Sequence, residues 1–332
     1  MKKFVAILLL AVMVLSLAAC GNKTAEYKLG MGVVVSTDSS ASQNAQVDAT
    51  VAAVVLDAQG KIVACRIDCA QNKMDVTDGQ VDPAKTFLTK NELKEDYNMV
   101  KFSDATLEWY QQAENFAAYA VGKTAAEIAG IETTVNEEGH TVAVDADLYA
   151  SCSISIADFQ AAIAKACADE QGVSFSSDGN FTFGLAANST AAESTAATAE
   201  EDGVVKMYTE FGAVVLGSDG KILAALTDAI QPKISIDAAG EITGADFVGT
   251  KRELKEDYNM VKFSDATLEW YQQAANFVAW AVGKTPAELQ SVETTTNEEG
   301  HTVFVDETLF ASCSISIDGM TAVLVKAASL AK

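Results

Sequence analysis

Histidine, the side chain most often used for acid–base chemistry near neutral pH, occurs only twice, as His140 and His301. Each follows an Asn-Glu-Glu-Gly turn, with no further nitrogen or sulfur ligands at the spacing of a zinc site. The phosphate-binding P-loop and the Gly-x-Gly-x-x-Gly, Gly-x-Ser-x-Gly and His-Glu-x-x-His motifs are also absent from the sequence. This pattern argues against a classical hydrolase and favours an electron carrier or a binding protein over an enzyme.

A polar segment, residues 89–99, returns as residues 250–260 with one difference, Asn91 against Arg252. Neighbouring parts of the two copies have diverged far more, so core packing alone does not explain the identity. One interpretation is a surface that faces a ligand or a partner. The alternatives are local gene conversion or a capped, salt-bridged start of a helix.

Cysteine is the other reactive residue type, and the sequence has six. Alanine occupies the positions of Cys65, Cys69 and Cys167 in the second copy, which is typical of thiols packed in a core. On one straight strand Cys65 and Cys69 would be about 13 Å apart, too far for a disulfide. Pairing of Cys167 with either one stays open.

The polar segment is part of a long repeat, whose helices and strands must position the histidines, the cysteines and the polar segment described above. Residues 89–156 return as 250–317, with 54 of 68 positions identical. A period this long indicates two domains rather than a solenoid. We expect a first repeat at 20–185, a flexible linker rich in Ala, Ser, Thr and Glu at 186–203, and a second repeat at 204–332.

Within each repeat the pattern predicts an α+β fold, a small antiparallel sheet with packed helices. A hairpin is expected at 51–67 and helices at 106–121 and 159–166, with Asp158 as a cap. The first repeat has two additional elements, a strand at 28–35 and a hairpin at 173–185 that turns at Asp178-Gly179. Because the second repeat lacks both, we expect them to pair and to form a sheet edge found only in the first.

The N-terminus combines a cationic start with an apolar run, as an export signal does. The run ends at Leu17-Ala18-Ala19-Cys20, which resembles the lipobox of bacterial lipoproteins. The resemblance implies cleavage of residues 1–19 and attachment of a lipid to Cys20. It places the protein on the extracytoplasmic face of the cell membrane, with the lipid anchor as its membrane contact.

The net charge limits the class of partner. Acidic side chains number 46 against 23 basic ones, for a formal charge of −23, and Arg66 and Arg252 are the only arginines. A nucleic-acid binder needs a basic surface to displace counterions from phosphate. Nucleic acid is therefore excluded as a main partner.

The order strand, Gly-Lys-Ile, strand, Thr-Lys-x-Glu-Leu, helix resembles the FMN-binding domain family, over roughly residues 45–168 and 205–330. That family attaches FMN to the threonine of Asp-x-x-Ser-Gly-Ala-Thr; here the corresponding residues are 147–153 and 308–314. The resemblance implies Ser153 and Ser314 as flavin-bearing hydroxyls, with Ser151 and Ser312 where the family has glycine. Non-covalent flavin and loss of the cofactor are the alternatives.

Basic side chains near the start of a helix could hold the FMN phosphate. The candidates are Lys90 and Lys94 with their copies Lys251 and Lys255. Tyr97, Trp109 and Tyr110 either stack on the flavin or form core. The sequence thus leaves two hypotheses: an FMN-carrying protein that passes electrons to a redox partner in the cell envelope, or a cofactor-free module that binds a small molecule, a peptide or an envelope partner.

Overall fold

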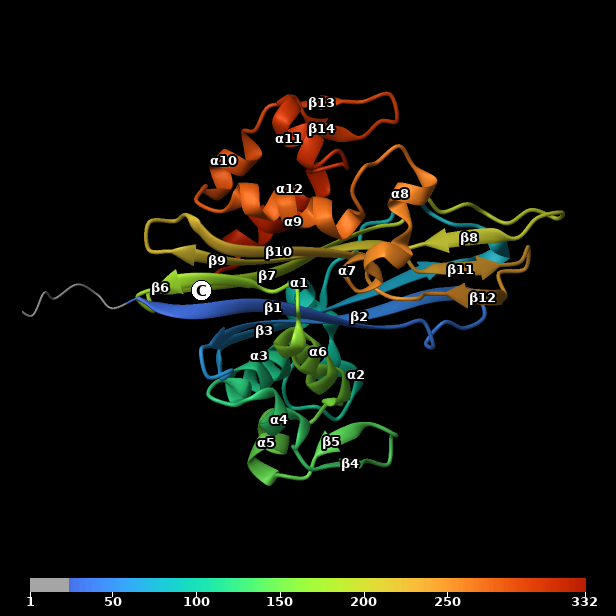
Figure 1. Ribbon diagram of the computed structural model, residues 1–332. Helices are drawn as coiled ribbons and strands as arrows, with labels where there is room; N and C mark the ends of the chain where they lie inside the picture. Colours follow the sequence, from blue (N-terminus) through green and yellow to red (C-terminus); the bar gives the residue numbers. More distant parts are fainter. Residues whose placement is uncertain (1–23) are drawn as a thin grey trace, which may run out of the picture.

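A computed structural model describes residues 24–332, so Cys20 and the signal sequence predicted at residues 1–19 lie outside the described residues. The chain forms four layers, with two sheets stacked face to face and helices on both outer faces (Figure 1). The strand orders are β3-β2-β1-β6 and β10-β9-β7, and every pairing is antiparallel. The predicted class, α+β with small antiparallel sheets and packed helices, is confirmed.

The helices recur in the same order in the two halves, whereas the number of strands differs. The first half comprises β1 (Ala25–Ser36), β2 (Asn44–Asp57), β3 (Ile62–Asp75), α1 (Lys90–Leu93), α2 (Met99–Phe102), α3 (Trp109–Ala120), α4 (Ala125–Ala129), β4 (Thr133–Val135), β5 (Thr141–Ala143), α5 (Ala146–Ser151), α6 (Ala157–Ala168) and β6 (Val173–Ser177). The second comprises β7 (Phe181–Thr190), β8 (Gly203–Lys206), β9 (Tyr208–Gly217), β10 (Ile222–Ile230), β11 (Lys233–Ile236), β12 (Ile242–Asp246), α7 (Lys251–Leu254), α8 (Met260–Phe263), α9 (Trp270–Ala281), α10 (Pro286–Gln290), β13 (Thr294–Thr296), β14 (Thr302–Phe304), α11 (Glu307–Ser312) and α12 (Asp318–Ser329).

Strand β2 shows why the sheets are buried on both faces. Its central residues 51–56 form an unbroken apolar run, which is typical of a strand covered on both sides. Val51, Ala53 and Val55 point into the core between the two sheets. Val54 and Leu56 point to the outer face, where α6 packs against β2 and α3 against the neighbouring β3. The predicted hairpin to β3 is confirmed.

The helices that cover the sheets follow the predicted periodicity. Helix α3 buries Phe116 and Ala120 on one face, as the spacing at 106–121 predicts. It begins at Trp109 rather than at 106, with Glu108 in the capping position, and Trp109 is buried as well. Helix α6 confirms the one predicted at 159–166 but begins at Ala157, after Ile156 in the capping position. Asp158 therefore lies in the first turn rather than capping the helix.

The expected hairpin at 173–185 is wrong in its second strand. Strand β6 pairs with β1, which confirms the predicted sheet edge in the first half. After the turn, however, β7 leaves that sheet and pairs with β9 along its whole length. It occupies the place in the second half that β1 has in the first: a Cβ built on Gly30 of β1 would clash with the carbonyl of Ala166 in α6, and one on Gly184 of β7 with that of Ala327 in α12. The second half therefore does not lack a first strand.

The flexible linker expected at 186–203 is also wrong. Residues 186–190 belong to β7, and Ala191 is fully buried. Further along, the backbone N–H of Ala197 donates to the carbonyl of Gly79 at 2.8 Å. The segment consists mainly of small side chains, so it shows no hydrophobic periodicity from which burial could be predicted. The same small side chains allow the backbone to pack closely against both sheets. The boundary between the halves is the turn at 178–180.

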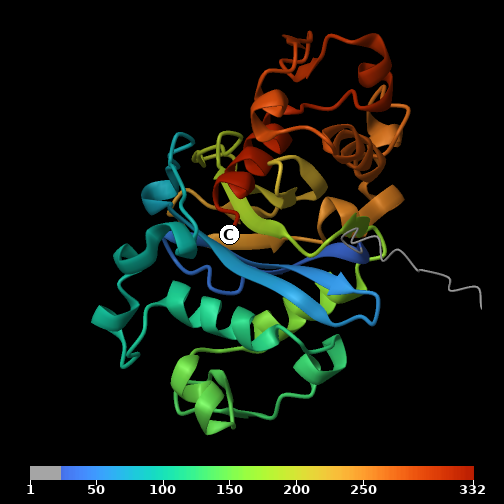
Figure 2. The same cartoon turned by 90° about the vertical axis from the view of Figure 1, so that its left-hand side faces the viewer.

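The two halves share one core. Leu29 and Met31 of β1 belong to the same apolar cluster as Phe183 and Leu185 of β7 and Phe211 of β9. Figure 2 shows the two sheets crossing one above the other, with the end of the chain at the seam between them. Side chains from both halves meet along this seam, and it holds the candidate site.

Candidate functional site

The polar segment 89–99 starts with a helix that is capped in both copies. The Thr89 hydroxyl accepts a hydrogen bond from the backbone N–H of Glu92, and the Glu92 carboxylate accepts one from the N–H of Thr89 at 3.0 Å. Thr250 and Glu253 repeat this capping box. The interpretation as a capped helix start is confirmed, and it accounts for part of the identity between the copies.

Asp68 of β3 ties this helix to the sheet. Its carboxylate is buried and accepts hydrogen bonds from the backbone N–H groups of Cys69 at 2.7 Å and Asn91 at 3.2 Å. Burial raises the pKa of Asp68 to about 6, although the hydroxyl of Thr89 and these N–H groups oppose the shift. Asp228 repeats the arrangement with Arg252 in place of Asn91, and burial again raises its pKa to about 6.

Beside this helix, a cavity of about 410 Å³ opens between the two halves, and we call it the open cavity. Strand β3, the polar segment and α3 line it from the first half, and β7 and the end of α12 from the second. The lining residues are Arg66, Ile67, Asp68, Thr89, Asn91, Glu92, Lys94, Tyr110, Glu114, Ala117, Leu185, Ala186, Ala187, Lys326, Leu330 and Lys332. Its volume lies within the usual range of small-molecule sites.

The corresponding place in the second half is nearly full, and its residual space of about 110 Å³ is the narrow cavity. Arg252, which replaces Asn91, reaches across the seam and donates to both carboxylate oxygens of Asp169 at 3.0 Å. The position of Asp169 is taken by Leu330 beside the open cavity. The one substitution in the repeated segment therefore separates a filled cleft from an open one.

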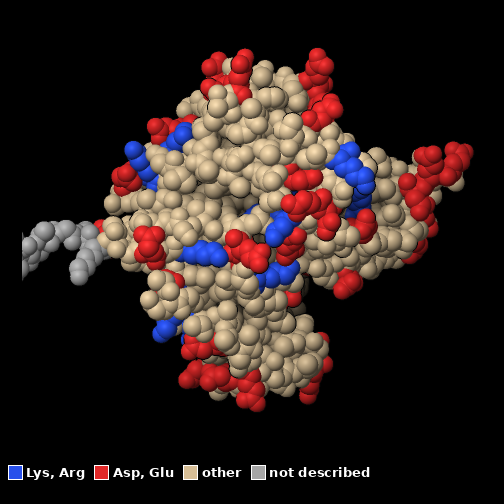
Figure 3. Space-filling model, in the orientation of Figure 1, with Lys and Arg blue, Asp and Glu red and all other residues tan. Residues whose placement is uncertain are grey.

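The charged residues of the open cavity fall into two groups. Lys326 pairs with Glu92 at 2.7 Å, and Lys332 pairs with Glu114. Arg66 donates instead to two backbone oxygens, from Nε to that of Phe183 at 3.2 Å and from Nη2 to that of Lys332, the last residue of the sequence, at 3.0 Å. Figure 3 shows red acidic side chains at the top, bottom and right-hand tip of the molecule, with most of the blue basic ones between these regions.

Lys94 has an unusual backbone. It adopts φ 49° and ψ −119°, and its copy Lys255 adopts the same angles. This region favours glycine, so a lysine there is strained by about 1–3 kcal/mol. The strain turns the chain sharply after α1 and is kept in both halves.

Of the eight residues predicted to bind flavin, only Lys94 lines the open cavity. Lys90 places its ammonium 4.9 Å from the ring centroid of Tyr97 and 5.1 Å from that of Trp109. Lys251 is enclosed likewise by Tyr208, Tyr258 and Trp270. These rings are therefore engaged by a lysine, and Trp109 packs in the core against Phe159.

The second buried lysine differs electrostatically from an ordinary surface lysine. Burial lowers the pKa of Lys251 to about 8, while the carboxylates of Glu210 and Asp228 oppose that shift. Lys251 lines a separate cavity of about 200 Å³ in the second half. Lys255 pairs with Glu170 at 3.3 Å.

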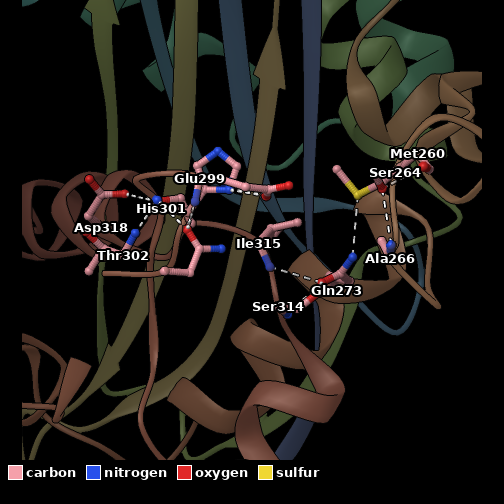
Figure 4. A network of polar contacts seen from close by, with 12 residues as sticks. Met260, Ser264, Ala266, Gln273, Glu299, His301, Thr302, Ser314, Ile315 and Asp318 are labelled. Carbon is pink, nitrogen blue, oxygen red and sulfur yellow. Dashed lines mark hydrogen bonds and ion pairs between the residues drawn. The ribbon is translucent and has the colours of Figure 1, made fainter. Parts of the chain in front are cut away.

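The serines of the expected flavin motif lie at the ends of short helices. The hydroxyl of Ser314 donates to Oε1 of Gln273 at 3.1 Å, and that oxygen also accepts from the N–H groups of Ser314 and Ile315 (Figure 4). Ser153 and Gln112 repeat this contact. The hydroxyls of Ser151 and Ser312 donate to backbone carbonyls within α5 and α11. None of the four serines lines the open cavity.

Histidine and cysteine contribute no reactive centre to the cavity. His140 and His301 are exposed, and each lies beside a glutamate of its own turn, as Figure 4 shows for His301. The five cysteines of the described chain are free thiols. Burial raises the pKa of Cys65 to about 12 and that of Cys69 to about 11, so both are protonated, as core thiols should be.

Sequence reasoning missed most of the lining. The site includes Arg66, Leu185, Lys326, Leu330 and Lys332 only because β7 of the second half packs against β3 of the first, which brings the end of α12 to the same cavity. Two signals were available: Arg66 is one of only two arginines, and the other, Arg252, marks the single difference in the repeated segment.

Comparison with models of known protein families, with characterised proteins and with solved structures finds no match. The resemblance to FMN-binding domains therefore stays a prediction. Across residues 24–332, the longest apolar helices fall short of what a membrane crossing requires.

Proposed function

We propose that this protein binds a small molecule in the open cavity between its two halves. One observation carries the proposal: duplicated halves place the same segment at two equivalent clefts, and only one of them is filled by a buried ion pair. Filling both clefts would stabilise the fold more simply. A cleft kept open at the cost of unfilled volume is typical of a ligand site.

The acidic groups of the cavity support binding rather than catalysis. Asp68 holds the start of α1, Glu92 closes the capping box and pairs with Lys326, and Glu114 pairs with Lys332. Carboxylates engaged in this way position the walls of a site and are poorly placed to move protons. Both halves share one core, which also holds the walls rigid before a ligand arrives.

The experiment that tests this function closes the open cavity by copying the filled one. The double variant Asn91→Arg with Leu330→Asp rebuilds the Arg252–Asp169 pair at the equivalent place. Native mass spectrometry of the protein purified from its own host should show a bound small molecule in the wild type and none in this variant. Leu330→Asp alone is the matched control. A wild type that carries no molecule and shows no thermal shift with any metabolite tested would contradict the proposal.

Electron transfer by FMN is the second candidate, and it rests on the family resemblance. Flavin absorption that survives acid precipitation and disappears in Ser153→Ala with Ser314→Ala would establish covalent flavin. Flavin released by acid and lost in the cavity-closing variant would make FMN the ligand of the open cavity. Absorption without flavin bands after incubation with FMN would exclude both.

We also propose that a lipid on Cys20 holds the protein at the outer face of the cell membrane, where an envelope partner would meet it. Strand β1 begins at Ala25, so about five residues, at most roughly 18 Å of chain, separate the lipid from the sheet. The folded body would then lie directly on the membrane surface. Detergent-phase partitioning that is lost in Cys20→Ala tests the anchor; partitioning unchanged in that variant would contradict it.

A further inference from the structure

We infer that the side chain of Lys251 forms an imine with a small apolar aldehyde that enters the cavity of about 200 Å³ in the second half, which we call the lysine cavity. The inference goes beyond the proposed binding function, because the lysine cavity and the open cavity share no lining residue. It follows from a comparison of Lys251 with Lys90, which is the same residue of the repeated segment in the first half.

In the part of the chain that the structure describes, the ammonium of Lys251 makes no hydrogen bond or ion pair. Only 6 % of the residue is exposed. Three aromatic rings surround the ammonium, and its Nζ lies 4.8 Å from the ring centroid of Tyr208, 4.9 Å from that of Tyr258 and 5.2 Å from that of Trp270. Aromatic rings attract a cation but replace only part of the hydration that an ammonium loses on burial.

Lys90 has a different set of neighbours. Burial would lower the pKa of Lys90, but neighbours that include Cys69 and Asp48 outweigh it and raise that pKa above its ordinary value. In the second half, Ala229 takes the place of Cys69 and Tyr208 that of Asp48. The two lysines belong to the same repeated segment, so the strands beneath the segment cause the difference between them.

The neighbours in the second half leave Lys251 with a reactive amine. Burial lowers the pKa of Lys251 to about 8, although nearby carboxylates oppose the shift. These are the carboxylates of Glu210, Asp228 and Glu193. Near pH 8 about half of the Lys251 amines are therefore neutral, against less than about 1 % for a lysine of ordinary pKa. A desolvated, neutral lysine amine is a nucleophile suited to attack on a carbonyl carbon.

The reaction needs no reagent besides the aldehyde. The lone pair of the neutral nitrogen forms a bond to the carbonyl carbon, and the carbonyl oxygen leaves as water with both hydrogens of the amine. The C=N bond that results requires no oxidant or reductant. Once protonated, the imine carries a positive charge at the place where three rings surround the ammonium of Lys251.

Glu210 supplies a second titratable group near this amine. Its carboxylate has the largest electrostatic effect on Lys251, and its Oε1 accepts a hydrogen bond from the Tyr208 hydroxyl at 3.2 Å. Burial raises the pKa of Glu210 to about 7, so this carboxylate takes up and releases a proton near neutral pH. In the first half Thr50, which does not titrate, occupies the same position.

The lysine cavity suits a small apolar body. Its lining residues include Phe247, Val248, Leu254 and Tyr258. Its volume lies below the usual range of drug-sized sites, so a molecule about as large as benzaldehyde or a short-chain aldehyde fits it. Lys233 lines the same cavity but is exposed, which makes it an internal comparison with an ordinary amine.

Reductive trapping on the full chain tests the inference. Benzaldehyde is added at pH 8 with sodium cyanoborohydride, which reduces an imine to a stable benzylamine, and peptide mass mapping measures the rate of labelling at each lysine. We expect Lys251 to be labelled roughly tenfold or more faster than Lys90 and Lys233, because its amine is both desolvated and largely neutral.

Two variants check the site. In Lys251→Gln the first adduct seen by intact mass should disappear, and the rate at Lys233 should stay unchanged. Tyr208→Asp, which copies Asp48, places a carboxylate beside the ammonium and should slow the labelling of Lys251 about tenfold. Thermal unfolding of each variant checks that the fold is kept. If Tyr208→Asp fails to fold, the comparison of Lys251 with Lys233 in the unaltered chain decides the matter.

Labelling of Lys251 no faster than that of Lys233 would overturn the inference, as would a first adduct that persists in Lys251→Gln. A rate at Lys251 that is unchanged in a folded Tyr208→Asp variant would overturn it as well. Closure of the open cavity by Asn91→Arg with Leu330→Asp should leave the labelling of Lys251 unchanged. Failure of this inference and failure of the proposed binding function are therefore distinguishable.

Discussion

Arg252 and Asp169 lie in different halves of the chain and form a buried pair in which one guanidinium nitrogen contacts both carboxylate oxygens at 3.0 Å. Both side chains are over nine-tenths buried. Asn91 and Leu330 occupy the equivalent positions at the other end of the seam and leave the open cavity between the halves. The same two positions of the repeat therefore form a buried ion pair in one cleft and line an open cavity in the other.

Removal of the buried Arg252–Asp169 ion pair should destabilise the protein. Arg252→Ala leaves Asp169 buried without its partner, and we expect a loss of about 3–5 kcal/mol in the free energy of unfolding. Urea unfolding followed by circular dichroism measures it. Asn91→Ala is the matched control: it removes one hydrogen bond, to the Ile67 carbonyl at 2.8 Å, and should cost about 1 kcal/mol. Equal costs for the two variants would show that the pair contributes nothing special.

Relief of backbone strain should stabilise the second half. Lys255 has φ 49°, so Lys255→Gly should raise the free energy of unfolding by about 1 kcal/mol, even though it removes an exposed ion pair with Glu170. Lys255→Ala keeps the Cβ and hence the strain, and should give no gain. Chemical denaturation of both variants tests this. A glycine variant less stable than the alanine variant would rule out the strain.

The buried Asp68 should make stability depend on pH in an identifiable direction. Its folded pKa of about 6 lies above the ordinary value of 3.8, so the folded state binds the proton more tightly. The contribution of this group to stability is therefore complete at low pH and is lost as pH rises from about 4 to about 6.

Asp68→Asn keeps an acceptor for the N–H groups of Cys69 and Asn91 and removes the titration. Compared with the wild type, the variant should gain roughly 2 kcal/mol of stability between pH 4 and pH 7. Denaturation curves at both pH values measure the change, and exposed Asp147→Asn is the control. A wild-type-to-variant difference that is the same at both pH values would contradict the assignment.

The place of β7 in the second sheet can be tested at one glycine. A Cβ on Gly184 would lie 1.8 Å from the carbonyl oxygen of Ala327, so Gly184→Ala must push α12 away from the sheet. We expect a loss of roughly 1–3 kcal/mol, measured by thermal or urea unfolding. Gly244 in β12 has open space at its Cβ, and Gly244→Ala should change stability little. If Gly184→Ala is as harmless as that control, β7 does not pack under α12.

Local patterns determined much of the fold. The apolar run of β2, the Gly60 turn and the helical spacing in α3 each depend on residues close in sequence, so hairpin and helix could be predicted from them. The same holds for the capping box of Thr89 and Glu92, whose spacing of three residues defines its geometry. The repeat revealed that these elements occur twice.

The packing of the two halves, which no local pattern encodes, places β7 in the second sheet and creates the open cavity. Backbone hydrogen bonds depend little on the identity of the side chains. The sequence around the tight turn therefore does not determine whether β7 pairs with its neighbour β6 or with β9. Once the sheets are stacked, Asn91 and Leu330 line one cleft, whereas Arg252 pairs with Asp169 at the other. The sequence shows that the repeated segment differs at Asn91 and Arg252. The structural effect of this difference depends on residues about 80 or more positions away, which only the packing of the two halves brings close.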